Sequence, residues 1–377
     1  MIKNSRMKRF QKEQIIKDLE KKIVFIVGPR QVGKTWLAKD IAKSFTNPVY
    51  LNYDRLEDRQ IIHNEAWLDS NDLLILDELH KMKNWKNFIK GVFDTKPEKQ
   101  KILVTGSARL DTFRYSGDSL VGRFFLHRLL PFTPAEIYKI KEDIPLNTFL
   151  AKGCFPEPFL AEDITEVNRW RRQYINGLIR YDILDFERIQ ELKAIETIFE
   201  LLRHRIGSPI SFRSIAEDVG ISSNTVKKYI QILEALFIIF RINPFSKNIA
   251  RSLLKEPKLY FYDIGLVKGD EGIILENLVA LSLMKKAFEI VDYTGKNTCL
   301  NYLRTKDGKE VDFCFVQDEN IQYILEVKLS DSSISKPLKY FHEKYNLPAI
   351  QLVKNLKREH KKNSMNVLKA DEFLKKL

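Results

Sequence analysis

Cysteine is scarce in this chain of 377 residues. Three cysteines occur, they lie far apart in the sequence, and no two of them form a CxxC pair. A disulfide framework or a zinc site needs several cysteines at short, regular spacings. Neither is therefore expected for Cys154, Cys299 and Cys314.

Long apolar runs are also absent. A membrane-spanning helix needs about 20 consecutive apolar residues, but the longest candidate, Ala235 to Phe240, lies between Glu234 and Arg241. The N-terminal residues are charged and lack the apolar core of a secretory signal. These absences argue against a membrane partner and against secretion, and a cytoplasmic protein is expected.

Acidic residues are outnumbered by basic ones. The chain has 63 lysines and arginines against 50 aspartates and glutamates, which gives a formal net charge of +13 and a pI near 9.3. Basic residues are dense at positions 3–9 and 357–362. Such a surplus favours polyanionic partners, of which nucleic acid, and DNA in particular, is the first candidate. The alternative is a solvated, lysine-rich surface without such a partner.

The sequence does contain a complete phosphate-binding loop. Val24 to Thr35 reads VFIVGPRQVGKT, which includes the full G-x-x-x-x-G-K-[ST] pattern. An apolar strand is expected at Ile23 to Val27 and an amphipathic helix at Trp36 to Phe45, which is the context that this loop needs. Backbone N–H groups of the loop surround a phosphate, the lysine adds a charge for the β and γ oxygens, and the threonine hydroxyl can hold Mg²⁺. The pattern predicts a chain that binds ATP with Mg²⁺.

A second apolar strand ends in two carboxylates. Residues 72–78 read DLLILDE, which is typical of a buried parallel strand whose acids emerge at the C-terminal end, where an open α/β sheet places its ligand. Asp77 is expected to hold Mg²⁺ opposite Thr35, and Glu78 is expected to polarise an attacking water. The pair favours ATP hydrolysis over phosphoryl transfer to a substrate.

A third strand and several arginines add candidates for the γ-phosphate. Residues 101–107 read KILVTGS, and either Thr105 or Ser107 is a candidate sensor of the γ-phosphate, the alternative being a plain turn. Arg123 is a candidate arginine finger, supplied within its own chain or by a neighbouring subunit of a homo-oligomer. The competing arginines are Arg109, Arg114 and Arg128.

Three longer stretches resemble a known family. They read GPRQVGKT (28–35), LDELHKMKNWKNFIKGVFD (76–94) and GSARLDTFRYSGDSLVGRFFLHRLLPFTPAE (106–136). The sequence KGCFPEP at 152–158 resembles the Gly-Gly-Phe-Pro-Glu-Pro segment of the same family, with a lysine and a cysteine as small departures. The chain is similar in these motifs to the prokaryotic AAA-type ATPases often called archaeal ATPases, which carry a C-terminal domain of unknown function. The resemblance runs to near the C-terminus and implies an AAA-type core.

The middle of the chain is expected to be helical. Residues 144–205 indicate helices with charged faces, in the position where AAA-type proteins carry a helical lid. Residues 211–220 predict a short helix that ends at a glycine, and Thr225 to Leu236 predict a second helix after a turn. With Phe237 to Ile242 as the strand of a wing, the pattern is that of a winged helix-turn-helix.

This helix-turn-helix has two interpretations. In the first, the start of the second helix faces DNA. In the second, the module packs against protein only. The residues that would contact DNA are Ser222, Ser223, Asn224, Lys227 and Lys228.

The last hundred residues contain a constellation of acids. Glu276 lies on an expected helix (Ile273 to Lys286), Asp312 lies in an otherwise apolar strand, and Glu326 and Lys328 are two apart on another strand, so they share a face. The set resembles the core of restriction-endonuclease-like nucleases, where two acids hold Mg²⁺ and a lysine positions or deprotonates water. The resemblance implies that Glu276, Asp312 and Glu326 bind metal and that Asp312, Glu326 and Lys328 are catalytic. The alternative is that these residues serve binding or stability only, with Glu326 and Lys328 as a surface ion pair.

The sequence as a whole predicts an α/β multidomain protein. The expected parts are a P-loop AAA-type domain with a parallel sheet at 1–143, a helical lid or linker at 144–205, a winged helix-turn-helix at 206–245 and a nuclease-like α/β domain at 246–377. The leading hypothesis is an ATPase that acts on nucleic acid, and the alternative is an ATP-dependent switch whose C-terminal domain binds a protein partner. The expected nucleotide-binding residues are Gly28, Pro29, Arg30, Gln31, Val32, Gly33, Lys34, Thr35, Trp36, Asp77 and Ser107, with Glu78 and Arg123 as catalytic residues.

Overall fold

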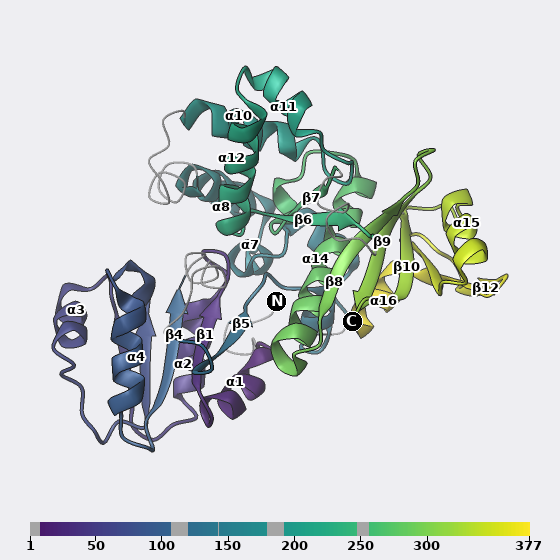
Figure 1. Ribbon diagram of the computed structural model, residues 1–377. Coiled ribbons are helices and arrows are strands. Elements are labelled where there is room, and N and C mark those ends of the chain that lie inside the picture. The colour runs from purple at the N-terminus through teal and green to yellow at the C-terminus, as the bar shows by residue number, and fades with distance from the viewer. Residues whose placement is uncertain (1–7, 107–119, 142, 179–191, 247–255) are drawn as a thin grey trace. The chain divides into compact units, whose positions relative to one another are not determined.

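The computed structural model describes residues 8–106, 120–141, 143–178, 192–246 and 256–377 (Figure 1). The chain forms two compact units, Ser5–Leu130 and Pro131–Leu377. No helix in these described ranges is long and apolar enough to cross a membrane, the 24-residue α14 (Glu271–Thr294) included.

The first unit is built on a parallel sheet of five strands in the order β2-β3-β4-β1-β5. Every residue of β1 and β3 is buried, as expected for runs of Val, Ile and Leu in a sheet covered on both faces. The predicted parallel sheet is therefore present. Its strands are β1 (Ile23–Val27), β2 (Pro48–Asn52), β3 (Leu73–Asp77), β4 (Lys101–Gly106) and β5 (Phe124–Arg128).

Helices connect and cover these strands. The helix after the phosphate loop begins at Lys34, two residues earlier than expected, and ends at Ala42. A single 3₁₀ turn, η2 (Leu79–Lys81), follows β3 directly, so the acids at the end of that strand lie at the edge of the sheet. The α-helices of this unit are α1 (Gln11–Leu19), α2 (Lys34–Ala42), α3 (Leu56–His63) and α4 (Trp85–Thr95).

The second unit begins with a series of helices. Side-chain caps start several of them: Asp163 accepts hydrogen bonds from two backbone N–H groups of α8, and Ser211 and Ser222 cap α11 and α12. Gly220, at φ 76°, ends α11 in the left-handed conformation that glycine adopts without strain. The helices are α5 (Pro134–Tyr138), α6 (Leu146–Lys152), α7 (Pro156–Leu160), α8 (Ile164–Gly177), α10 (Leu192–Arg203), α11 (Phe212–Val219) and α12 (Ser223–Ala235).

A mixed sheet of eight strands completes this unit, in the order β12-β13-β11-β10-β9-β8-β6-β7. Strands β8, β9 and β10 form an antiparallel meander, and β11 lies parallel to β10. The strands are β6 (Ile239–Pro244), β7 (Lys258–Phe261), β8 (Thr298–Arg304), β9 (Glu310–Gln317), β10 (Asn320–Lys328), β11 (Ala349–Val353), β12 (His360–Lys362) and β13 (Met365–Lys369), with η5 (Ile264–Leu266), α14, α15 (Lys336–Tyr345) and α16 (Ala370–Lys376) as helices.

The strand expected to form a wing belongs to this larger sheet. Strand β6 pairs antiparallel with β7 and, through Asn243 and Pro244, parallel with β8. The strand that follows α12 is therefore part of the C-terminal sheet.

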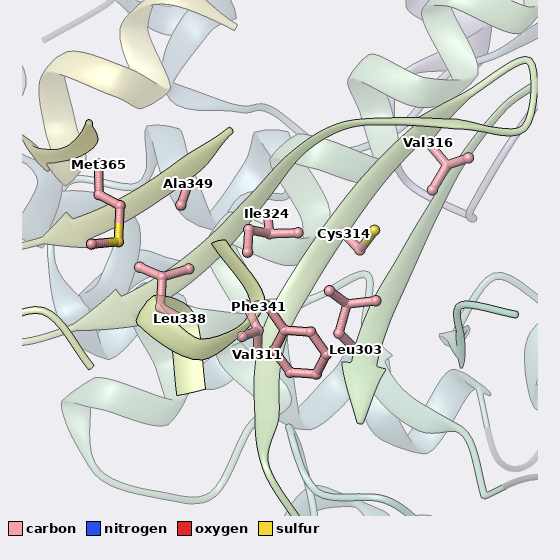
Figure 2. Close-up of a cluster of buried hydrophobic side chains, with 9 residues drawn as sticks. All are labelled: Leu303, Val311, Cys314, Val316, Ile324, Leu338, Phe341, Ala349 and Met365. Carbon is pink, nitrogen blue, oxygen red and sulfur yellow. The ribbon is translucent and has the colours of Figure 1, made fainter. Parts of the chain in front are cut away.

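One core cluster lies between α15 and the meander. Figure 2 shows Leu338 and Phe341 of α15 facing side chains from the neighbouring strands. Both Val311 and Cys314 of β9 take part, although they are three residues apart. The register explains this, because β9 carries one extra residue between these two positions relative to β8. Such a bulge changes the side to which the following residues point.

Candidate functional site

The phosphate loop joins β1 to α2 along a close backbone contact. A Cβ atom at Gly28 would overlap the carbonyl oxygen of Leu129, so only glycine fits there. Gly33, at φ 97°, is the residue immediately before α2. Two of the predicted loop residues differ in exposure. The side chain of Val32 is fully buried, so only its backbone can contact a ligand, whereas Arg30 is exposed. Trp36, 37% exposed, lies in the first turn of α2.

Lys34 lies across this loop. Its side chain is buried, and Nζ donates hydrogen bonds to the carbonyl oxygens of Gly28 (2.9 Å) and Pro29 (2.7 Å). The ammonium is therefore held inside the curve of the loop, where the phosphate groups of a nucleotide would lie.

Asp77 is the centre of a buried hydrogen-bond network. Its side chain is completely buried at the end of β3. The hydroxyls of Thr35 (2.7 Å) and Tyr50 (2.6 Å) donate to Oδ2, and the hydroxyl of Thr105 donates to Oδ1. The carboxylate thus connects α2, β2, β3 and β4. Burial, together with the hydrogen bond and charge of Asp77, raises the pKa of Tyr50, so this phenol stays a donor.

Thr35 and Asp77 are suitable ligands for Mg²⁺. The structure brings the two side chains together, as the sequence suggested. Mg²⁺ binds hard oxygen ligands and takes few of them from the protein, because it keeps waters and substrate phosphate oxygens. One hydroxyl and one carboxylate next to the phosphate loop fit that requirement.

Glu78 follows Asp77 with a left-handed backbone, at φ 57°. Its carboxylate lies 3.6 Å from His80 Nδ1 and 3.9 Å from Lys81 Nζ. Burial raises the pKa of Glu78, while the charges of Lys34 and Lys81 lower it, and the pKa stays above its usual value. A raised pKa suits a carboxylate that must accept a proton from water.

The candidate arginine finger lies at the wrong edge of the sheet. Arg123 immediately precedes β5, whose first residue pairs with Ile23, the first residue of β1. The phosphate loop follows the opposite end of β1. The guanidinium of Arg123 instead contacts Asp94 Oδ1 at 2.9 Å. Arg123 therefore cannot reach the loop of its own chain, and a role toward a neighbouring subunit stays a prediction. Arg128, buried and paired in register with Val27, is at the correct edge.

Of the two candidate sensors of the γ-phosphate, Thr105 lies within the described residues and Ser107 does not. Thr105 contacts Asp77 and is completely buried, so it supports the carboxylate. Ser107, together with Arg109 and Arg114, lies outside the described residues.

The side chains predicted to contact DNA are exposed. Ser222 is the N-cap of α12, and its hydroxyl oxygen accepts the backbone N–H of Thr225 at 3.1 Å. The other side chains expected to contact DNA point to solvent along the first two turns of α12. They are Ser223, Asn224, Lys227 and Lys228.

The C-terminal acids come together at one end of the meander. Asp312 lies at the β9 bulge, and its Oδ2 accepts the backbone N–H of Val327 at 2.9 Å. Glu326 is buried, 5% exposed, and its Oε1 contacts Lys328 Nζ at 2.8 Å. Glu326 Oε2 has no hydrogen-bond partner among the described residues. Burial of Glu276, on α14, raises the pKa of its carboxyl group, and the negative charge of Asp312 raises it further.

Three further residues belong to this cluster and were not predicted from the sequence: Lys258, Tyr260 and Glu310. Lys258 of β7 is buried, and its Nζ lies 2.8 Å from Glu310 Oε1, 3.7 Å from Asp312 Oδ1 and 3.9 Å from Glu276 Oε1. Tyr260, also on β7, donates a hydrogen bond to Glu276 Oε1 at 2.7 Å. The sequence does carry a signal for Lys258, because it is the charged first residue of a run that is otherwise apolar or aromatic, KLYFY.

The predicted metal centre does not fit this arrangement. Within the described ranges, no group of three or more His, Cys, Asp or Glu side chains could hold a metal ion. The expected ligands Glu276, Asp312 and Glu326 therefore do not form such a site, and a lysine ammonium lies among the acids instead. Although burial disfavours the ammonium, the charges of Asp312, Glu276 and Glu310 raise the pKa of Lys258.

Comparison with known proteins covers most of the chain. Residues 20–138 match the model of an AAA domain, and residues 143–269 and 271–373 match two domains of unknown function, DUF8612 and DUF4143. An uncharacterized protein of Methanocaldococcus jannaschii is 28% identical over 338 residues, which cover 79% of this chain and 73% of that protein. An uncharacterized protein of Mycobacterium tuberculosis is 24% identical over 332 residues, which cover 84% of this chain and 73% of that one.

Among solved structures, the chain is similar to a Walker-type ATPase of Pyrococcus abyssi, with 14% identity and a TM-score of 0.47 over 68% of this chain and 93% of that one. It is also similar to the RuvB Holliday junction branch migration motor of Thermotoga maritima, with 18% identity and a TM-score of 0.33 over 65% of this chain and 94% of that one. At these TM-scores neither likeness bears on function. Residues 20–138 thus match an AAA domain and contain the phosphate loop, and residues 271–373 match DUF4143.

Proposed function

We propose that the unit Ser5–Leu130 binds ATP with Mg²⁺ and hydrolyses it to ADP and phosphate. The observation that carries the proposal is the buried carboxylate of Asp77, bonded to the loop hydroxyl of Thr35 and followed directly by Glu78. The AAA domain supports nucleotide binding, and the raised pKa of Glu78 supports a role as a base.

Each residue has a distinct part in this reaction. The loop backbone and Lys34 bind the phosphate groups and neutralise their charge. Thr35 and Asp77 would hold Mg²⁺, which supplies stabilisation of the negative charge that develops on the phosphate oxygens. Glu78 orients a water and accepts its proton. Thr105 and Tyr50 keep the Asp77 carboxylate in one orientation through their hydrogen bonds.

ATP binding and turnover in purified variants test this proposal. Lys34→Ala should abolish both, because the ammonium inside the loop is lost. Lys43→Ala is the matched control, since Lys43 immediately follows α2, is exposed, and pairs only weakly with Asp40 at 3.4 Å. Equal ATP turnover in Lys34→Ala and the control would overturn the proposal.

For the unit Pro131–Leu377 we propose binding of nucleic acid, DNA first, through the start of α12. Two observations favour DNA binding here. Lys227 and Lys228 are exposed next to small polar side chains at the start of a helix, and the chain has a net charge of +13. The proximity of Glu276, Asp312 and Glu326 supports a nuclease-like fold for the DUF4143 domain. Lys258 among these acids argues against metal-dependent cleavage, so binding without cleavage is the form of the proposal.

Salt-titrated DNA binding tests this second proposal. Lys227→Ala/Lys228→Ala should weaken binding and reduce the slope of log affinity against log salt by about 2, one unit for each lost phosphate contact. Lys296→Ala/Lys306→Ala removes the same charge from two exposed lysines elsewhere. Equal effects of the two pairs would reject a specific surface at α12. No binding at moderate salt would favour the alternative, a nucleotide-dependent switch that binds a protein partner.

A further inference from the structure

We propose that the ammonium of Lys258 takes the place of a divalent metal ion beside Glu276, Asp312 and Glu326. These acids then bind no metal while the lysine is present, and they gain a metal site when its charge is removed. The proposal goes beyond ATP hydrolysis and DNA binding and depends on neither.

The position of Lys258 is the first argument. Its Nζ contacts carboxylates from α14 and from two positions of β9, at 2.8–3.9 Å, and its side chain is 1% exposed. Strand pairing fixes its backbone, because Lys258 pairs with Ile242 of β6 and forms a bridge to Pro209. The ring of Tyr302 lies 5.3 Å from Nζ and adds a cation–π contact. The ammonium is thus held among three carboxylates, whose negative charges it balances.

Two of the four carboxylates depend most on the charge of Lys258. Glu310 also contacts Arg304, at 3.4 Å, and Glu326 contacts Lys328, at 2.8 Å. Glu276 and Asp312 have Lys258 as their cation within 4 Å in the part of the chain that the structure describes. Removing the lysine charge would leave these two half-buried carboxylates without that cation, which is a costly arrangement.

The orphaned oxygen of Glu326 is an independent observation. Glu326 is 5% exposed, and Oε2 is buried without a hydrogen-bond partner among the described residues. Its charge interacts with those of Asp312, Glu276 and Lys258. A buried, unpartnered carboxylate oxygen next to two further acids is the kind of ligand that Mg²⁺, Mn²⁺ or Ca²⁺ binds.

The backbone also closes the site. A Cβ atom at Gly207 (φ 74°) would lie 2.7 Å from Glu276 Oε1, so the loop before α11 packs tightly against this carboxylate. Tyr260 donates a hydrogen bond to the same oxygen. Gly207 and Tyr260 therefore both approach the same oxygen of Glu276.

Binding of Mn²⁺ to the full chain without nucleotide tests the proposal. The variants are Lys258→Met and the double variant Lys258→Met/Asp312→Asn, and bound Mn²⁺ is counted by electron paramagnetic resonance. Lys258→Met should gain one Mn²⁺ site, about tenfold or more tighter than any site of the wild type, and the double variant should lose it. Lys309→Met is the matched control, because Lys309 pairs with exposed Asp307 in the turn between β8 and β9 and should leave binding unchanged.

Two results would overturn the proposal. One is an Mn²⁺ site in the wild type that Asp312→Asn removes, which would make the cluster an open metal site. The other is a folded Lys258→Met chain that gains no Mn²⁺. Lys258→Gln, which keeps a polar side chain, replaces Lys258→Met if that variant does not fold. If neither lysine variant folds, Mn²⁺ binding is compared between the wild type and Asp312→Asn. The proposal predicts equal binding in these two proteins, and weaker binding in Asp312→Asn would overturn it.

Discussion

Tyr50→Phe is the most direct perturbation of the Asp77 network. The substitution removes one hydroxyl and leaves the ring and the strand unchanged. Tyr50 donates at 2.6 Å to a carboxylate that is completely buried, and hydrogen bonds to charged groups contribute about 1.5–3 kcal/mol each. Asp77 keeps Thr35 and Thr105 as donors. The free energy of unfolding of this unit should therefore fall by about 1.5–3 kcal/mol.

Urea unfolding followed by tryptophan fluorescence measures this change. Of the four tryptophans, Trp36, Trp67 and Trp85 lie in this unit, so the signal reports mainly on it. Tyr53→Phe is the control, because the Tyr53 hydroxyl contacts the imidazole of His63, at 3.1 Å, instead of a carboxylate, and its loss should cost only about 0.5–1.5 kcal/mol. A Tyr50→Phe chain that unfolds at the same urea concentration as the wild type would refute the account of the network.

Three further predictions concern the loop, the second unit and pH. Gly28→Ala should weaken ATP binding about tenfold or more, measured by fluorescence titration, because its Cβ would overlap Leu129. Lys285→Met should lower the free energy of unfolding, measured in urea, by about 3–5 kcal/mol, because it removes the ammonium that lies 2.6 Å from the buried carboxylate of Glu136. ATP turnover should fall as pH falls, because protonated Glu78 cannot act as a base. The midpoint of this fall should lie above the ordinary glutamate pKa of about 4.3, because burial raises the pKa of Glu78. A midpoint at or below that value would contradict this role of burial.

The sequence was sufficient for features that depend on local order. The phosphate loop is a contiguous motif, and the apolar run that ends in Asp77 and Glu78 predicts a buried strand with acids at its edge. Strands β1 and β3 both run parallel to β4, so the phosphate loop after β1 and Asp77 at the end of β3 lie at the same edge of the sheet. The contact between Thr35 and Asp77 follows from this arrangement. The two helices α11 and α12 were also predicted from local patterns, the first by its end at Gly220 and the second by the turn before it.

Features that depend on strand pairing were not readable. Arg123 was a plausible finger until β5 proved to run parallel to β1, which places it at the far edge. Tyr50 meets Asp77 only because β2 lies beside β3. Lys258 reaches Glu276 and Glu310 across elements separated by long stretches of chain, and a local pattern carries no information about such contacts.

ATP turnover and ATP binding of Glu78→Gln test the central claim most directly. The variant keeps the loop, Lys34 and the Thr35–Asp77 pair, so it should bind ATP with Mg²⁺ as tightly as the wild type. Without the carboxylate that accepts a proton from water, turnover should fall about 100-fold or more. Wild-type turnover in Glu78→Gln, or a wild type that hydrolyses no ATP in the presence of Mg²⁺ and of any DNA offered, would contradict the assignment of this site.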